Sequence, residues 1–411
     1  MISYRKKILD NGLTVAVNRD PQSKLAAVNI LYKVGARNED PRRTGFAHLF
    51  EHLMFRGTRR VPDYDVPVQM ASGDNNAFTN NDYTDFYLTL PVGNLETALW
   101  LESDRMEGLD ISAEKLAAEK KVVIEEFRQR YLNQPYGDQM MLMRDLSYKV
   151  HPYRWATIGR SIDHIADATL EEVRDFHRRH YHPSNAVLSI SADLPEDEMI
   201  RLAEKWFGDI ADNGMTADPL PQEPRQTEAR RLEVERDVPA TTFTMAFHMG
   251  ARCSEDFYVA DLVSDLLSSG DSSRLYTRLV KERRLLSSVN AYITGDLDPG
   301  LFIFTGQLLP DTTPTEAEAA VWDEIRTLAT TDPAPREIEK VKNKFEANTL
   351  FGELNVMNKA MNLGFYALTG DMDLINREVD IYRAVDAAAI RRFAREVLRQ
   401  DNCSTLIYKA R

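Results

Sequence analysis

Hydrophobic and polar residues alternate along several short segments of the chain and recur at helical spacing along longer ones. The alternating segments, which predict strands, are residues 25–32, 85–90 and 186–192. The segments with helical spacing are residues 45–57, 94–107, 113–132 and 170–180. Strands interspersed with pairs of helices predict an α+β fold, in which helices pack on one face of a mixed sheet.

The two halves of the chain resemble each other. A Gly-Ala-Arg triplet follows an alternating segment at Gly35 and again at Gly250, 215 positions later. Near the ends of the halves, Phe176 recurs as Phe393 at an offset of 217. Two distant matches at nearly equal offsets indicate an internal duplication, and so two similar domains.

A segment rich in proline and glycine separates the halves. Residues 212–228 read DNGMTADPLPQEPRQTE and follow neither a helical nor a strand period. Such composition between patterned segments is typical of a linker. We therefore predict a first domain over residues 1–213, a linker over 214–229 and a second domain over 230–411.

The strongest local motif is the HxxEH sequence formed by His48, Glu51 and His52. On a helix these three side chains share one face, and two imidazoles one turn apart can both bind a single Zn²⁺. The glutamate between them can act as general base on a water bound beside it. The flanking residues are apolar on nearly every side, so three polar groups there need a partner, and a metal ion supplies it.

A third metal ligand is expected on the predicted helix 113–132. Glu119 and Glu126 lie two turns apart and share a face, whereas Glu125 is rotated away. Either the two carboxylates point inward to a metal, or the helix is solvated and its nearby lysines and arginines pair with them. Periodicity alone leaves both interpretations open.

Composition excludes several classes of protein. Hydrophobic residues make up 43% of the 411 residues and charged residues 28%, which is ordinary for a folded globular protein. A formal net charge of −13 argues against a nucleic-acid partner. The two cysteines, Cys253 and Cys403, form no zinc or disulfide pattern. No apolar run is long enough to span a membrane and the N-terminus lacks a signal-like core, so we expect a cytoplasmic protein, or a periplasmic one if a signal was removed.

A second group of histidines has a plainer interpretation. His177, His180 and His182 surround a predicted helix end. We expect them to cap that end or to lie in solvent, and not to form a second metal site.

Motifs along the whole chain resemble those of peptidase family M16, the pitrilysin and insulinase type of zinc peptidase. The resemblance begins with GFAHLFEHLMFRGT at residues 45–58 and continues through NAFT at 76–79. It then runs through the segment 119–126, His151-Pro152-Tyr153, SSRL at 272–275 and VKNKFEANTLF at 341–351. The chain is similar in length to the short two-domain members, including those like the mitochondrial processing peptidase. The resemblance implies two α/β-roll domains, in agreement with the duplication.

The resemblance also assigns roles to the candidate site residues. It implies that His48, His52 and Glu126 bind one Zn²⁺ per chain and that Glu51 is the general base. Glu119 would be a supporting carboxylate of the catalytic site.

Substrate binding is implied for a separate segment. The residues Asn76, Ala77, Phe78 and Thr79 would form an edge strand, onto which a peptide or an unfolded polypeptide segment adds through main-chain hydrogen bonds. Taken without the resemblance, DNNAFTNND predicts only a turn.

The chain departs from the family pattern in its second half. Members with a complete site carry an arginine and a tyrosine seven residues apart after the SSRL segment, but here those positions hold Val280 and Ser287. We therefore expect the zinc-bearing subunit of a heterodimer with a homologous subunit of family M16, or failing that a homodimer. The alternative is a non-catalytic scaffold or peptide-binding subunit of the same fold, which would have no reason to keep the metal motif.

Overall fold

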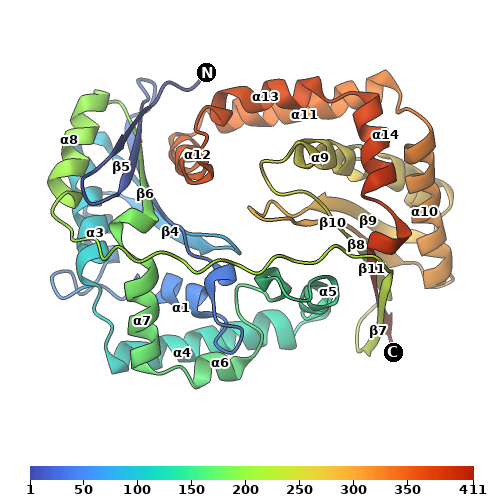
Figure 1. The fold of residues 1–411 in the computed structure, drawn as a ribbon, viewed down its shortest axis with the longest axis horizontal. Coiled ribbons are helices and arrows are strands. Elements are labelled where there is room, and N and C mark those ends of the chain that lie inside the picture. The colour runs from blue at the N-terminus through green and yellow to red at the C-terminus, as the bar shows by residue number, and fades with distance from the viewer. The chain divides into compact units, whose positions relative to one another are not determined.

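In the computed structural model, which describes residues 1–411, the chain divides into two compact units (Figure 1). Unit 1 comprises Met1–Arg128, Trp155–Pro221 and Leu350–Arg377. Unit 2 comprises Gln129–Arg154, Gln222–Thr349 and Glu378–Arg411. The boundary after Pro221 falls inside the predicted linker. The compact units differ from the predicted domains in residues 129–154 and 350–377, each of which packs with the other half of the chain.

Unit 1 is built on a six-stranded mixed sheet with the order β1-β2-β6-β3-β5-β4. Its strands are β1 (Arg5–Ile8), β2 (Thr14–Arg19), β3 (Leu25–Tyr32), β4 (Asp74–Thr79), β5 (Thr84–Pro91) and β6 (Ala186–Ala192). All neighbours are antiparallel except β2 and β6. Gly12, with φ of 88°, closes the β1–β2 hairpin at an Asn-Gly turn. β4 is an edge strand, so one side of its backbone is available for pairing.

Unit 2 repeats this arrangement in a five-stranded sheet with the order β7-β11-β8-β10-β9. Its strands are β7 (Arg230–Arg236), β8 (Thr242–His248), β9 (Leu286–Ile293), β10 (Leu301–Leu308) and β11 (Cys403–Ala410). The parallel pair is β7 with β11, and the other neighbours are antiparallel. Each strand from β2 to β6 therefore has a counterpart, and the counterpart begins 217 residues later for β5 and β10 and for β6 and β11. The predicted α+β fold and the internal duplication are confirmed.

The helices follow the same duplicated order. Those of the first half are α1 (Phe46–Leu53), α2 (Asp65–Met70), α3 (Leu95–Gly108), α4 (Ala113–Phe127), α5 (Gln139–Ser147), α6 (Ile162–Ala166), α7 (Leu170–His180) and α8 (Glu196–Phe207). Those of the second half are α9 (Glu255–Ser268), α10 (Pro314–Thr330), α11 (Pro335–Gly352), α12 (Val356–Thr369), α13 (Leu374–Ala384) and α14 (Ala387–Glu396). The predicted helix 113–132 ends earlier, since α4 stops at Phe127 and passes into a π-helical turn over Arg128–Leu132.

The two halves exchange one helix each. α12 belongs to the second half in sequence but packs on β2, β3 and β6 of unit 1. Gly364 allows this close packing, because a Cβ there would lie 2.5 Å from Asn29 Oδ1 and 2.8 Å from Ser189 Oγ. Lys359 of the same helix donates to Asp20 at 2.7 Å. Close packing at Gly364 and a largely buried ion pair thus hold α12 on the sheet of unit 1.

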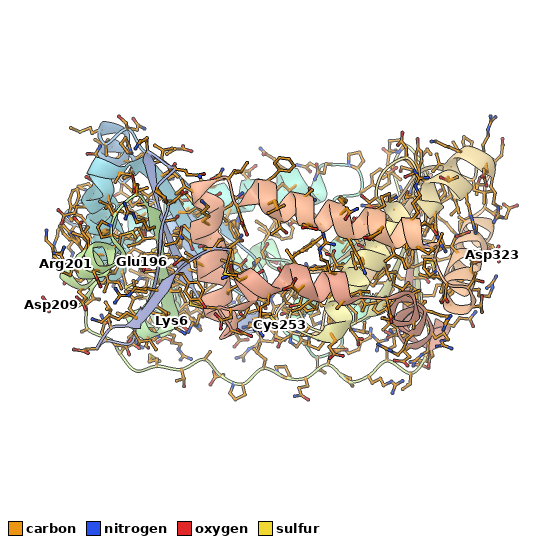
Figure 2. All side chains as sticks on the ribbon, turned by 90° about the horizontal axis from the view of Figure 1, so that it is seen from above. Lys6, Glu196, Arg201, Asp209, Cys253 and Asp323 are labelled. Atoms are coloured by element: carbon orange, nitrogen blue, oxygen red, sulfur yellow. The ribbon has the colours of Figure 1, made fainter.

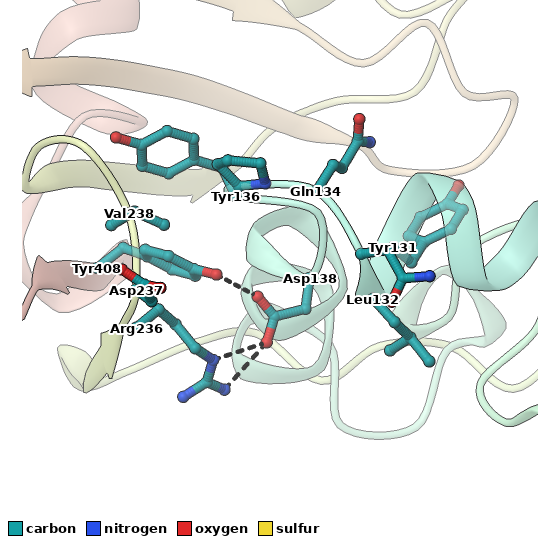
Figure 3. A pocket seen from close by; sticks show the side chains of 11 residues that line it. Tyr131, Leu132, Gln134, Tyr136, Asp138, Arg236, Asp237, Val238 and Tyr408 are labelled. Atoms are coloured by element: carbon teal, nitrogen blue, oxygen red, sulfur yellow. Dashed lines mark hydrogen bonds and ion pairs between the residues drawn. The ribbon is translucent and has the colours of Figure 1, made fainter.

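α5 makes the reciprocal exchange and packs on β7, β8 and β11 of unit 2. Asp138, immediately before α5, accepts a hydrogen bond from Tyr408 Oη at 2.6 Å and from Arg236 Nη2 at 3.0 Å (Figure 3). These three residues line a cavity of about 530 Å³ together with Tyr131 and Tyr136. The charge-assisted contacts hold the start of α5 against the two strands.

Charged side chains cover the exposed parts of unit 1. Figure 2 shows Lys6 of the edge strand β1 and Arg201 of α8 among them, and both are exposed. Such charges on an edge strand disfavour pairing with another chain. Over the described chain, every helix is too short or too polar to cross a lipid bilayer.

Candidate metal centre

α1 carries the HxxEH motif and is buried along most of its surface. It begins after Gly45, whose φ of 93° only glycine adopts readily, and the residues Phe46, Ala47, Leu49, Phe50 and Leu53 are buried. Phe50 stacks on Phe176 of α7, with ring centroids 5.5 Å apart. This aromatic packing fixes the rotation of α1 and leaves the motif on the remaining face.

α4 packs against α1 and supplies the carboxylates. Ser112 caps its N-terminus by accepting from Lys115 N at 3.2 Å. Val123 and Phe127 are buried, and Glu119 has only 2% of its surface exposed. The face of α4 that carries Glu119 and Glu126 therefore points towards α1, and the solvated-helix interpretation does not apply to these two residues.

His48, His52 and Glu126 converge on one point. The Nε2 of His48 lies 3.6 Å from Oε2 of Glu126, and the Nε2 of His52 lies 3.4 Å from the same oxygen. One ligand atom from each residue falls within 4.8 Å of the other two. The two residues of α1 and the one of α4 thus form a compact set of two nitrogens and one oxygen.

This donor set suits a zinc ion. Zinc bonds of about 2.0–2.1 Å at tetrahedral angles place two ligand atoms about 3.3–3.4 Å apart. The observed separations of 3.4 and 3.6 Å are close to that value. Three protein ligands of the His/His/Glu type leave a fourth position for water, as in catalytic zinc sites.

Glu119 contacts the other nitrogen of His52. Its Oε2 lies 3.3 Å from His52 Nδ1, and its Oε1 accepts a hydrogen bond from Arg56. Burial raises the pKa of Glu119, but the bonds from His52 and Arg56 outweigh it and hold the pKa below its ordinary value. Burial likewise lowers the pKa of His52, whereas Glu119 and Glu126 raise it to about 9. The contact with Glu119 occupies Nδ1 of His52 and leaves Nε2 directed towards Glu126.

Glu51 lies on the same turn of α1 as His48 and His52, and its carboxylate faces the edge strand β4. Burial raises the pKa of Glu51, while hydrogen bonds from the side chain and backbone N–H of Thr79 lower it. Thr79 is the last residue of β4, which pairs with β5 on one side only. The carboxylate of the motif and the end of the predicted substrate strand are thus in direct contact.

The structure brings together most of the residues predicted from the sequence. His48, Glu51, His52, Glu119 and Glu126 form one cluster, and Thr79 joins it through Glu51. The segment read in isolation as a turn is a strand: Asn76 is exposed, Ala77 is buried and Phe78 packs on Tyr83 with ring centroids 5.8 Å apart. Their roles in substrate binding remain a prediction.

Arg56 is a member of the cluster that the sequence analysis missed. It lies four residues after His52, beyond the end of α1, and binds Glu119. The signal that could have found it was its position one turn beyond the motif, facing the same way as His52.

The positions of the missing arginine and tyrosine lie in unit 2. Val280 is partly buried against the hydrophobic core of that unit. Ser287 is exposed in β9 and donates to Gln307 O at 3.3 Å. Neither side chain can supply a guanidinium or a phenol.

The prediction for the histidines around the end of α7 was wrong in part. His180 and His182 are buried rather than solvated, with 8% and 4% of their surfaces exposed. His182 Nδ1 lies 2.7 Å from Asp212 Oδ1, and His177 stacks on Tyr181. Burial lowers the pKa of both His177 and His180 to about 4. His177 and His180 are therefore neutral near pH 7 and pack behind α1, where the ring of His177 lies 5.7 Å from that of Phe50.

Two family models match the chain. The model of the insulinase family, peptidase family M16, matches residues 14–148, and the model described as the peptidase M16 inactive domain matches residues 167–345. Zinc protease PqqE of Helicobacter pylori is 32% identical over 302 residues, which make up 72% of this chain and 68% of that protein.

Further similarities extend over nearly the whole chain. A probable mitochondrial-processing peptidase subunit beta of Schizosaccharomyces pombe is 24% identical over 390 residues, or 91% of this chain and 84% of that protein. A solved structure of a protease from Helicobacter pylori matches with a TM-score of 0.95 and 26% identity, and 100% of each chain is covered.

Proposed function

This chain belongs to peptidase family M16, and we propose that it is a zinc-dependent endopeptidase subunit that hydrolyses peptides or unfolded polypeptide segments. The proposal rests on one observation: the ligand atoms of His48, His52 and Glu126 converge, and Glu51 lies on the face of α1 that carries the two histidines. A bound zinc ion would polarise the scissile carbonyl and lower the pKa of a water molecule beside it.

Glu51 is the proposed general base and later the general acid. It takes a proton from the attacking water and passes it to the departing amine. Burial raises its pKa above the ordinary value of a glutamate, which makes the carboxylate a stronger base towards water. Thr79 holds the carboxylate by hydrogen bonds and so fixes where the proton is transferred.

The free edge of β4 is the proposed substrate site. An extended peptide that pairs with Asn76–Thr79 would be held by its main chain, so the site would accept many sequences. Because Thr79 also binds Glu51, pairing along this edge would bring the peptide backbone to the general base.

We propose that a homologous subunit completes the site in a heterodimer, with a homodimer as the second arrangement. Val280 and Ser287 stand where an arginine and a tyrosine would help to bind the tetrahedral intermediate. Loss of such a donor commonly costs about 10²–10³ in rate. The similarity to a protein named as a processing peptidase subunit beta supports a division of labour between chains.

A non-catalytic scaffold or peptide-binding subunit is the competing function. The match of residues 167–345 to a domain described as inactive favours it for the second half. Against it stands the complete metal-ligand set in the first half, since a scaffold does not require one.

Cleavage of a quenched, unstructured peptide tests the proposal. Zinc-loaded wild-type chain and Glu51→Gln are assayed alone and after mixing with a homologous subunit that carries the Arg/Tyr pair. Cleavage that depends on Glu51 and increases on mixing supports the peptidase subunit. Equal cleavage with and without the partner removes the need for a heterodimer, and no cleavage in any mixture favours the scaffold.

A further inference from the structure

The N-terminus of α1 is held by a glutamate that lies outside the metal motif. Glu39 Oε2 accepts from Gly45 N and its Oε1 accepts from Ala47 N, each at 2.9 Å. Glu39 is 5% exposed. Its two carboxylate oxygens therefore bind the first turn of α1. His48 is the next residue along the helix.

A distant residue is needed here because α1 has no cap of its own. Helices usually begin with Ser, Thr, Asp or Asn, whose side chain accepts from the first turn. Position 45 must be glycine, since its φ is 93° and a Cβ there would lie 2.7 Å from Ile158 O. With no side chain at that position, the free N–H groups are satisfied by a carboxylate from six residues upstream, which also suits the helix dipole.

The loop that carries Glu39 is fixed at its other end to the substrate strand. Ala36 N donates to Asn80 O at 3.1 Å and Arg37 N donates to Asn81 O at 2.9 Å. These acceptors directly follow β4. The indole N–H of Trp155 also binds Ala36 O, at 3.0 Å. The loop 35–39 thus contacts both α1 and the chain that leaves β4.

We propose that Glu39 is a positioning residue of the metal centre, which fixes the first turn of α1, and with it His48, relative to the end of β4. The inference rests on the proposed function, because it gives this turn the task of holding a metal ligand. Glu39 acts through two backbone N–H groups and touches neither metal nor substrate. Because Glu39 is only 5% exposed, its carboxylate has little access to water as an alternative partner.

A helix cap that only stabilises the fold is the competing explanation, and metal binding separates the two. In Glu39→Gln the amide cannot accept at both positions, so the first turn loses one of its two bonds with little change in volume. We expect the zinc dissociation constant to rise about tenfold, within the range typical of residues that orient metal ligands. The visible absorption of the Co²⁺-loaded protein should change as well, because it reports ligand geometry.

Thr313→Ala is the matched control. Thr313 caps α10 of unit 2 by the same kind of bond, accepting from Glu316 N at 3.3 Å, and α10 carries no metal ligand. It should lose stability with wild-type zinc affinity and a wild-type Co²⁺ spectrum. Trp155→Phe is a milder second variant, which removes one anchor of the loop and should weaken zinc binding less than Glu39→Gln.

The outcomes distinguish the inference from the function on which it rests. Weaker zinc binding with an altered Co²⁺ spectrum in a folded Glu39→Gln, or in Trp155→Phe if the first variant does not fold, supports the inference. Wild-type affinity and spectrum in the folded variant overturn it and leave the proposed function intact. A wild-type chain that binds no zinc overturns both.

Discussion

His52 and Glu119 are joined through the imidazole nitrogen that faces away from the metal position. His52 Nδ1 lies 3.3 Å from Glu119 Oε2, while Nε2 lies 3.4 Å from Glu126 Oε2. One carboxylate thus contacts the nitrogen on one side of the ring, and the other lies where it could bind a metal ion together with Nε2. The seven-residue spacing on α4 is what allows two glutamates to contact both nitrogens of one histidine.

Replacing Glu119 by Gln should weaken zinc binding about 10–100-fold, because the single, uncharged amide oxygen cannot accept from both His52 and Arg56. Chelator competition measures the dissociation constant. Glu125→Gln is the control, since Glu125 is exposed on the same helix and pairs with Arg128. Equal affinity of Glu119→Gln and wild type would show that Glu119 has no role in orienting the ligand.

Arg56→Ala should weaken zinc binding in the same direction but by a smaller factor, about threefold to tenfold. Arg56 is half exposed, whereas the Glu119 side chain it binds is 2% exposed. Without the guanidinium, the Glu119 carboxylate still contacts His52 but is no longer held in place. Arg128→Ala is the control. It breaks the exposed ion pair between Arg128 and Glu125 and should leave zinc affinity unchanged. If Arg56→Ala weakened zinc binding more than Glu119→Gln, Arg56 could not act through Glu119.

Glu51→Gln should retain one zinc per chain and lose peptide cleavage by about 10²–10⁴-fold, because the amide cannot accept a proton. Metal analysis and a quenched-peptide assay are made on the same sample. Loss of the metal together with activity would instead assign Glu51 a structural role at the site.

Stability should fall as the pH decreases from about 6.5 to about 4. Burial lowers the pKa of His177 and His180 to about 4 from an ordinary value of 6.5. Between these values the unfolded chain binds protons that the folded chain does not, so acid favours unfolding. Each histidine should contribute roughly 1–3 kcal/mol over this interval.

Urea unfolding of the chelator-treated protein at pH 7 and pH 5 measures this effect. The variant His177→Phe/His180→Phe should show a smaller decrease in unfolding free energy between the two pH values than wild type. The same decrease in both proteins would mean that other groups cause the acid sensitivity.

Gly364→Ala should destabilise the protein by about 1–3 kcal/mol, because the added methyl group would collide with Asn29 and Ser189 on the sheet of unit 1. Gly108→Ala is the matched control, since a Cβ at that helical glycine meets no atom within 4 Å. Thermal unfolding compares the two. A neutral Gly364→Ala would contradict the close packing of α12.

The sequence predicted which side chains gather at the candidate site, because their spacing along two helices is local. His48, Glu51 and His52 share one helix face by spacing alone, and the separation of Glu119 and Glu126 does the same on α4. The alternation of residues 25–32 and 186–192 corresponds to β3 and β6, and the offset of Phe176 and Phe393 is that of the helices that hold them, α7 and α14.

Features that depend on distant partners were not predictable in this way. β4 reads as a turn because its polar residues do not alternate, and it becomes a strand by pairing with β5. The exchange of α5 and α12 leaves no periodic signal, since both helices bury an apolar face in whichever unit they join. Glu39 lies in a loop, and its bonds to α1 follow from the glycine that the helix start requires.

Anomalous diffraction from zinc-loaded crystals shows whether His48, His52 and Glu126 bind the catalytic zinc ion. We expect one strong anomalous peak per chain, at about 2.0–2.1 Å from the Nε2 atoms of His48 and His52 and bonded to a carboxylate oxygen of Glu126. A peak at another position, or no peak between these three side chains at full zinc loading, would contradict this expectation.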